Sequence, residues 1–299
     1  MAHILNIKTD QRIIIMKRQF YTTGVFLLVI TLIFSSCNQR PAKVKENQVK
    51  NSKGQIGTVE VEIFDAVKLK DQLVDIIKTA PKPTELVDFI NKGGYSYMAD
   101  LTLSTDKAEK YVTLAEQSMA AGIYKFDLYY AKTYNRYDIV DQIFDVQQML
   151  VGKIGLQSDV ASMKKYDERI KQNKGNSDSL NVIVTAAMNE LSQSYLTGEH
   201  SGVYALSYVS ANIEGLYIIT QIASMATDNT ELIKLIGLQK ERVKTNYQLL
   251  EIMSADPAVA PIFDKMKPIL NSFSSPEFTA KQFAEVTPLI AALRNEIGK

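Results

Sequence analysis

The sequence predicts an all-α fold, namely a single domain of about ten antiparallel helices arranged as a helical bundle or as a repeat-like stack of helix hairpins. Apolar residues recur at helical spacing along most of the chain after residue 57. Ser, Thr, Asp or Asn stands near the start of many of these segments, and Gly, Asn or Pro near the end. No segment sustains the alternation of apolar and polar residues that is typical of a half-buried strand.

The apolar stripes and the residues that flank them set the expected helix boundaries. Pro81 and Pro83 end the first helix, and Gly93-Gly94 ends the second. The predicted helices span residues 59–79, 84–91, 106–121, 122–134, 137–155, 158–172, 177–196, 201–225, 229–254, 258–273 and 279–297. Short connections favour antiparallel neighbours. A weak internal similarity at a spacing of about 80 residues, which pairs "GIYKFDLYYA" with "GVYALSYVSA", is compatible with a duplication or with chance.

An apolar run of 11 residues, residues 24–34, lies near the beginning of the chain. At about 1.5 Å per residue it extends over about 16 Å, which is short of the roughly 20 residues that cross a bilayer core. Lys17 and Arg18 precede the run, and Ser35 and Ser36 follow it. This order of basic, apolar and small residues is that of a secretory signal peptide.

Cys37, the one cysteine of the chain, comes directly after this run. Phe34-Ser35-Ser36-Cys37 resembles a bacterial lipobox, in which a bulky apolar residue and two small residues precede a cysteine. The resemblance implies acylation of the Cys37 sulfur, cleavage before Cys37 and an anchor of several acyl chains, which holds a protein stably on a membrane. The alternative is a plain signal peptide or signal anchor in which Cys37 is an ordinary thiol.

The chain is therefore expected to comprise four segments. Residues 1–15 precede a start at Met16 and are expected to be an extension from a wrongly chosen start codon. Residues 16–36 form the lipoprotein signal peptide. Residues 37–57 are polar and basic, cannot bury a core, and are expected to form a flexible tether. Residues 58–299 form the all-helical domain.

Composition excludes several classes of function. Removal of residues 1–36, which hold four basic residues and one acidic residue, changes the formal net charge from +1 to −2. A nucleic-acid partner is not expected, because such binders usually carry a basic excess. His200 is the only histidine left and no cysteine follows Cys37, so most Ser-His-Asp, Cys-His and zinc constellations are excluded. No cofactor and no metal site is predicted, and no catalytic residue is assigned.

The segment 201–227 contains one charged residue, Glu214. Its apolar and small residues cover all faces of a helix, which predicts a central position in the fold. Polar residues interrupt it too often for a membrane span. Glu214 is therefore expected to be buried, and a buried carboxylate must be paired, hydrogen-bonded or protonated. It is either a structural residue with a polar partner or a carboxylate that faces a ligand.

Residues 124–137, "YKFDLYYAKTYNRY", contain five tyrosines. Helical spacing places Tyr124, Asp127 and Tyr134 on one face, with Tyr130 on another. Tyrosines in such a pattern either fill the core or line a groove in which Asp127 is the polar contact. Tyr217 is a further candidate for ligand binding.

Residues 91–103, "NKGGYSYMADLTL", form an irregular segment. Gly93-Gly94 allows unusual backbone angles. Tyr95, Tyr97 and Asp100 add polar groups to a mainly apolar piece. The segment is either a loop that lines a pocket or a connection packed down by its own side chains.

The order of lipobox, tether and helices, together with "PKPTELVDFINKGGYSYMADL", "GIYKFDLYYAKTYN" and "NIEGLY", resembles an uncharacterised family of all-helical lipoproteins from Bacteroidota. The similarity runs from about Val74 to the C-terminus. It implies the anchor and the helical fold, and it carries over no activity and no catalytic residue. Among such lipoproteins, acidic residues just after the cysteine accompany export to the cell surface. Asn38, Gln39 and Arg40 stand there in this chain, so the outer membrane, facing the periplasm, is the expected location.

Three hypotheses for function follow. The first is a non-enzymatic binding or scaffold lipoprotein of the cell envelope that engages an envelope protein or a small molecule in a groove. The second is a carboxylate-dependent enzyme on an envelope glycan, with Glu214 as acid or base and help from Asp127 and Asp100. The third is a structural spacer with neither groove nor pocket. The enzyme needs two carboxyl groups at a water-accessible cleft, whereas a scaffold can hold Glu214 in its core.

Overall fold

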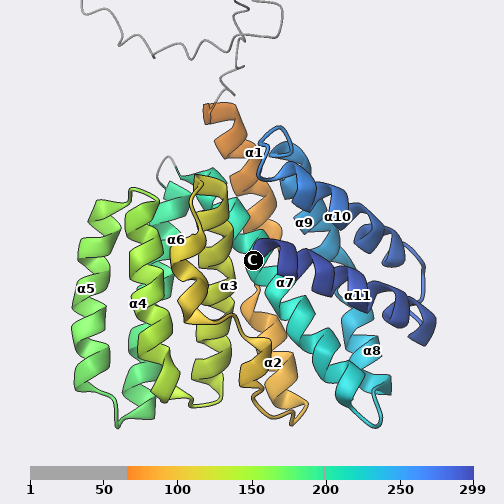
Figure 1. Cartoon of the computed structure of the whole chain (residues 1–299), viewed down its shortest axis with the longest axis horizontal. Coiled ribbons are helices and arrows are strands. Elements are labelled where there is room, and N and C mark those ends of the chain that lie inside the picture. The colour runs from red at the N-terminus through yellow and green to blue at the C-terminus, as the bar shows by residue number, and fades with distance from the viewer. Residues whose placement is uncertain (1–65, 198–199) are drawn as a thin grey trace, which may run out of the picture. The chain divides into compact units, whose positions relative to one another are not determined.

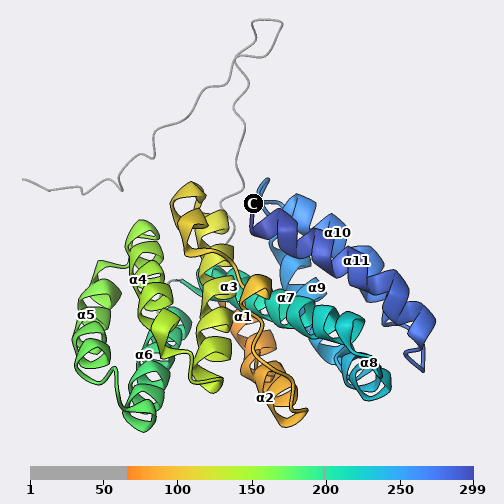
Figure 2. The same cartoon turned by 60° about the horizontal axis from the view of Figure 1, so that its bottom comes forward.

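The chain folds into helices that pack side by side, as Figure 1 and Figure 2 show from two directions. The computed structural model describes residues 66–197 and 200–299. In this part of the chain there are eleven α-helices and no strand, so the predicted all-α fold class is confirmed. The α-helices are α1 (Ala66–Thr79), α2 (Thr84–Lys92), α3 (Leu114–Thr133), α4 (Tyr137–Lys153), α5 (Gln157–Gln172), α6 (Ser177–Thr197), α7 (Ser201–Met225), α8 (Thr230–Gly237), α9 (Lys240–Ile252), α10 (Ala260–Ser272) and α11 (Ala280–Ile297). Two 3-10 helices, Ala99–Leu101 and Thr105–Lys110, lie between α2 and α3.

The contacting pair α3 and α7 lies at the centre of the helical bundle. Helices α4, α5 and α6 lie on one side of this pair, and α9, α10 and α11 lie on the other (Figures 1 and 2). Helices α1 and α2 pack against α7, and α2 also contacts α3. The described residues belong to one compact unit.

Helix α7 is buried along most of its length, as the sequence predicts. Nineteen of its 25 residues are buried. It contacts α1, α2, α3, α6, α8, α9 and α11. A helix with neighbours on every side has no solvated face, which explains why its apolar and small residues cover the whole helical wheel.

Gly122 lies inside α3, so the predicted helix boundary between residues 121 and 122 is wrong. A Cβ atom at Gly122 would lie 2.0 Å from Ser210 Oγ and 2.1 Å from the Ser207 carbonyl oxygen. The glycine therefore allows α3 to approach α7 closely and does not end a helix. The start of α3 is also later than predicted, because Thr113 and Glu116 form a capping box there.

A second difference from the prediction is a break within residues 229–254. The structure divides them into α8, which ends at Gly237, and α9, which begins at Lys240. A Cβ atom at Gly237 would lie 2.6 Å from Phe278 Cβ, so the end of α8 is shaped by contact with the segment before α11.

The predicted leader, tether and anchor fall outside the described residues. This applies to residues 1–36, to Cys37 and to residues 37–57. Within residues 66–197 and 200–299, no helix combines the length and the apolar character needed to cross a membrane.

Candidate functional site

Glu214 is completely buried in α7, which confirms the prediction of burial. Arg294 of α11 forms two hydrogen bonds with its carboxylate, with Nε to Oε2 at 2.8 Å and Nη2 to Oε1 at 2.9 Å. The guanidinium also lies over the ring of Tyr217, 4.9 Å from its centroid. Glu214 thus has the structural partner that one of the two sequence interpretations required.

Asp127 of α3 is the second completely buried carboxyl group, and it lies beside Glu214. Its Oδ2 accepts a hydrogen bond of 2.9 Å from the Leu103 amide, and no N–H donor reaches Oδ1. Burial and the negative charge of Glu214 raise the pKa of Asp127 well above its usual value. Burial also raises the pKa of Glu214, but the Arg294 guanidinium opposes that rise. Burial of Asp127 and the guanidinium bonded to Glu214 therefore favour the charge on Glu214 and the proton on Asp127.

The carboxyl network joins α3, α7 and α11 in the core and offers no access to solvent. Both carboxyl groups have 0% exposure. Asp100 is exposed on the first 3-10 helix. The structure therefore brings Asp127 and Glu214 together, as the enzyme hypothesis needs, but not at a water-accessible cleft.

Several of the candidate tyrosines hold the segment 95–104 against α3. The rings of Tyr97, Tyr130 and Tyr134 pack together with centroids 4.7 to 6.0 Å apart. The Tyr134 hydroxyl donates a 2.6 Å hydrogen bond to the Tyr95 carbonyl oxygen. These contacts are those of a packed connection.

Tyr124 and Tyr130 bond the backbone of the same segment. The Tyr124 hydroxyl donates to the Ser104 carbonyl oxygen at 2.7 Å. The Tyr130 hydroxyl accepts from the Met98 amide at 3.1 Å. Gly94, with φ 74°, turns the chain from α2 into this segment.

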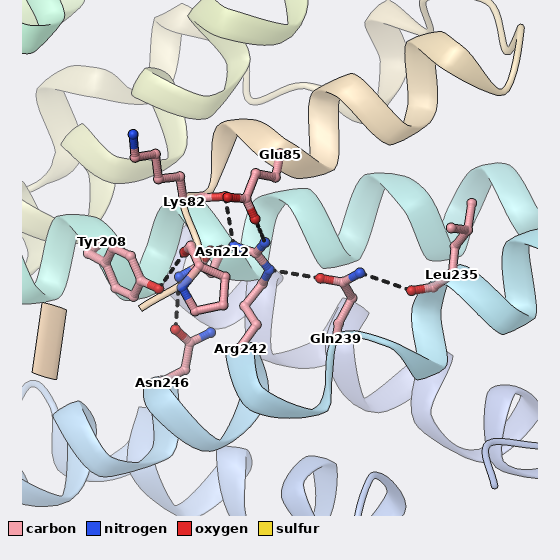
Figure 3. A network of polar contacts seen from close by, with 9 residues as sticks. Lys82, Glu85, Tyr208, Asn212, Leu235, Gln239, Arg242 and Asn246 are labelled. Carbon is pink, nitrogen blue, oxygen red and sulfur yellow. Dashed lines mark hydrogen bonds and ion pairs between the residues drawn. The ribbon is translucent and has the colours of Figure 1, made fainter. Parts of the chain in front are cut away.

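A second buried network surrounds Arg242 of α9, which is 1% exposed (Figure 3). Its Nη1 donates to the carbonyl oxygens of Pro81 and Lys82, both at 3.0 Å, and to Asn212 Oδ1 at 2.7 Å. Its Nη2 contacts Glu85 Oε2 at 3.2 Å. The guanidinium thereby fixes the connection between α1 and α2 onto α7 and α9. No sequence pattern pointed to Arg242.

A pocket of about 220 Å³ lies between α3, α6, α7 and the connection before α2. We name it the Lys125 pocket. Its polar and aromatic lining includes Lys125 and Tyr129 of α3, Asn189 and Ser192 of α6, and Tyr204 and Tyr208 of α7. No aspartate or glutamate lines it. Lys82 also lines it, and Figure 3 shows the Lys82 side chain extending away from Arg242.

Lys125 is one of the two lysines in this lining, and its side chain is half-buried. Its Nζ donates a 2.6 Å hydrogen bond to Ser192 Oγ and lies 5.6 Å from the centroid of the Tyr204 ring. Ser192 Oγ can accept this bond because its own proton goes to the Met188 carbonyl oxygen at 2.6 Å. Burial lowers the pKa of Lys125 to about 8, and no acidic neighbour opposes that shift.

Lys125 was not among the residues predicted from the sequence, although the sequence around it carries a weak signal. The residue stands between Tyr124 and Phe126 in the helix that was expected to be rich in buried tyrosines. A lysine in such a position has its charge partly removed from water. Its partner Ser192 lies 67 residues further along the chain, and only the packing of α6 near α3 brings the two together.

Neither similarity to known proteins nor a metal-binding cluster in the described residues points to a function. Comparison with protein-family models, with curated proteins and with solved structures finds no match to this chain. Within the described ranges, no group of three or more His, Cys, Asp or Glu side chains is placed to hold a metal ion. Inference about function therefore depends on the geometry of the Lys125 pocket and of the two buried networks.

Proposed function

We propose that the protein is a membrane-anchored, non-enzymatic binding protein of the cell envelope, and that its ligand site is the Lys125 pocket. One observation carries the proposal: the pocket combines a partly desolvated ammonium with aromatic and neutral polar groups and lacks a carboxylate. Concave sites with a few convergent polar groups and a perturbed pKa are typical of ligand binding.

The membrane part of the proposal depends on the sequence around Cys37. Acyl chains on Cys37 would hold the protein on the outer membrane, facing the periplasm, and residues 37–57 would link the helices to the anchor. The bound partner is then an envelope component or a small molecule that reaches this compartment.

The alternative of a carboxylate-dependent glycan enzyme has less support. Glycoside hydrolysis needs two carboxyl groups on either side of the scissile bond. Asp127 and Glu214 are neighbours with 0% exposure, and Arg294 is bonded to Glu214. A sugar cannot reach them without separation of α3, α7 and α11.

A screen of small fragments by ligand-observed NMR tests the proposal, with the full chain in a mild detergent. Asn189 is exposed at the rim of the pocket, so Asn189→Trp should cover the opening without disturbing the core. We expect fragments that bind the wild type to lose binding at least about tenfold in this variant.

Asn181→Trp is the matched control. Asn181 is also exposed on α6, but it lies roughly 12 Å further along the helix axis. Fragment binding should survive this change. If no fragment distinguishes Asn189→Trp from Asn181→Trp, the Lys125 pocket is not the ligand site.

A further inference from the structure

The chemical class of the ligand follows from the pocket lining, and this inference rests on the proposed function. We propose that the Lys125 pocket binds a small organic acid: a single carboxylate that pairs with the Lys125 ammonium, on an aromatic or compact apolar body that packs against Tyr129 and Tyr204.

The charge of the lining supports an anion. Lys125 contributes a positive charge, and its hydrogen bond in the pocket goes to the neutral hydroxyl of Ser192. Glu85 is the acidic residue nearest in sequence to Lys82, but its carboxylate pairs with Arg242 and does not line the pocket. A desolvated cation without a carboxylate nearby gains most from a ligand that supplies one.

The size of the pocket limits the ligand to about one ring with its acid group. Apolar cavities of about 150 Å³ accept benzene, and the Lys125 pocket has about 220 Å³. The extra volume suits a carboxylate. A nucleotide or an oligosaccharide would extend well beyond it.

The aromatic residues define where the apolar body lies. Tyr129 and Tyr204 are half-buried and line the pocket from α3 and α7. The Tyr204 ring also lies near the Lys125 ammonium. An aryl carboxylate can therefore contact both tyrosine rings while its acid group reaches Nζ.

The pairing of a ligand carboxylate with Lys125 requires the protonated form of the lysine. The other titratable groups in the lining are Lys82 on the connection before α2, Tyr129 on α3, and Tyr204 and Tyr208 on α7, while α6 contributes none. Burial raises the pKa of Tyr129 and Tyr208 to about 12 and also raises that of Tyr204. The tyrosines therefore stay neutral over the range in which Lys125 loses its proton.

The test compares benzoate with its neutral counterpart benzamide, using the full chain and isothermal titration calorimetry or ligand-observed NMR. At about pH 6.5 we expect benzoate to bind at least about tenfold more tightly than benzamide. Between about pH 6.5 and about pH 9.5, benzoate affinity should fall at least about fivefold as Lys125 deprotonates, while benzamide affinity stays constant.

Two variants separate charge from shape. Lys125→Met removes the ammonium but leaves the Ser192 hydroxyl bonded to the Met188 carbonyl. The Lys125→Met variant should lose the preference for benzoate over benzamide. Its melting temperature should equal or exceed that of the wild type. Lys125→Arg should retain the preference for benzoate over benzamide, and its benzoate affinity should no longer fall at high pH.

The outcomes distinguish this inference from the proposed function. Equal affinities for benzoate and benzamide, or a benzoate preference that survives Lys125→Met, would overturn the organic-acid inference. The binding role would still stand if neutral fragments lost affinity in Asn189→Trp. If no fragment responds to Asn189→Trp, both the inference and the proposed function fail.

Discussion

Two buried carboxyl groups lie side by side at the centre of the bundle, and the Arg294 guanidinium is bonded to one of them. Glu214 forms the bidentate pair with Arg294, and the pKa of Asp127 beside it is raised by burial and by the charge of Glu214, which favours the neutral form of Asp127. A neutral acid in the core stabilises the fold only while it keeps its proton. Its pKa is raised on folding, so the folded state binds one more proton than the unfolded state over the intervening pH range.

Asp127→Asn should therefore change the pH dependence of stability. The Asn side chain can accept the Leu103 amide bond and donate an N–H to Glu214, with no need for a proton from solvent. Between about pH 4 and the raised pKa of Asp127, the free energy of unfolding of the wild type should fall relative to the variant by about 1.4 kcal/mol per pH unit. Urea denaturation across this range measures the difference.

The direction in which the stability difference between the wild type and Asp127→Asn changes with pH tests whether Asp127 is protonated in the fold. The variant should be the more stable protein at about pH 7, and its advantage should vanish as the pH falls toward the ordinary pKa of aspartate. If the wild type is instead more stable at neutral pH and loses that advantage on acidification, Asp127 is ionised in the fold and the assignment of the proton is wrong.

Individual helices are positioned by contacts between particular pairs. The approach of α3 to α7 depends on Gly122, because Ser207 and Ser210 occupy the space of a side chain. The position of α2 depends on Arg242 of α9, which bonds the carbonyl oxygens before it. Each contact can be removed by one substitution.

Gly122→Ala should lower the free energy of unfolding by about 3 kcal/mol or more, because the added methyl group meets backbone and α3 must move from α7. Gly202→Ala is the control: Gly202 lies in the first turn of α7, and a Cβ atom there meets nothing within 4 Å. That change should be neutral or stabilise by up to about 1 kcal/mol. If urea denaturation gives the same change in the free energy of unfolding for both variants, the close approach of α3 to α7 at Gly122 is unimportant for stability.

Arg242→Leu should lower the free energy of unfolding by about 3–5 kcal/mol, because it leaves buried carbonyl and amide oxygens without a donor. Amide hydrogen exchange in α2 should accelerate more than exchange in α5, which is remote from the change. Lys244→Met, on an exposed position of the same helix, should change stability by less than about 0.5 kcal/mol. A small effect of Arg242→Leu with unchanged exchange in α2 would contradict this role.

At the scale of the whole molecule, the proposal combines a membrane anchor with a helical binding unit. The anchor is predicted from Phe34-Ser35-Ser36-Cys37, and the binding unit is the bundle that holds the Lys125 pocket. The anchor is thus tested by processing of the precursor, separately from ligand binding.

Cys37→Ser should leave an uncleaved precursor that incorporates no labelled palmitate and does not partition into detergent as a lipoprotein. Ser36→Ala keeps a small residue before the cysteine and should be processed like the wild type. Mass spectrometry of the N-terminal peptide measures both outcomes. A Cys37→Ser protein that is still cleaved and acylated would show that Cys37 is not the lipidation site.

Sequence by itself determined the helical class, the central place of residues 201–225 and the burial of Glu214. These properties depend on periodicity and on a run of residues without charges, which are local features. Tertiary structure decided that Arg294, 80 residues from Glu214, is its partner, that Gly122 permits a close helix contact, and that Lys125 meets Ser192 in a pocket. Those pairings depend on which helix faces lie together in space, and the spacing of residues along one helix does not specify its neighbour.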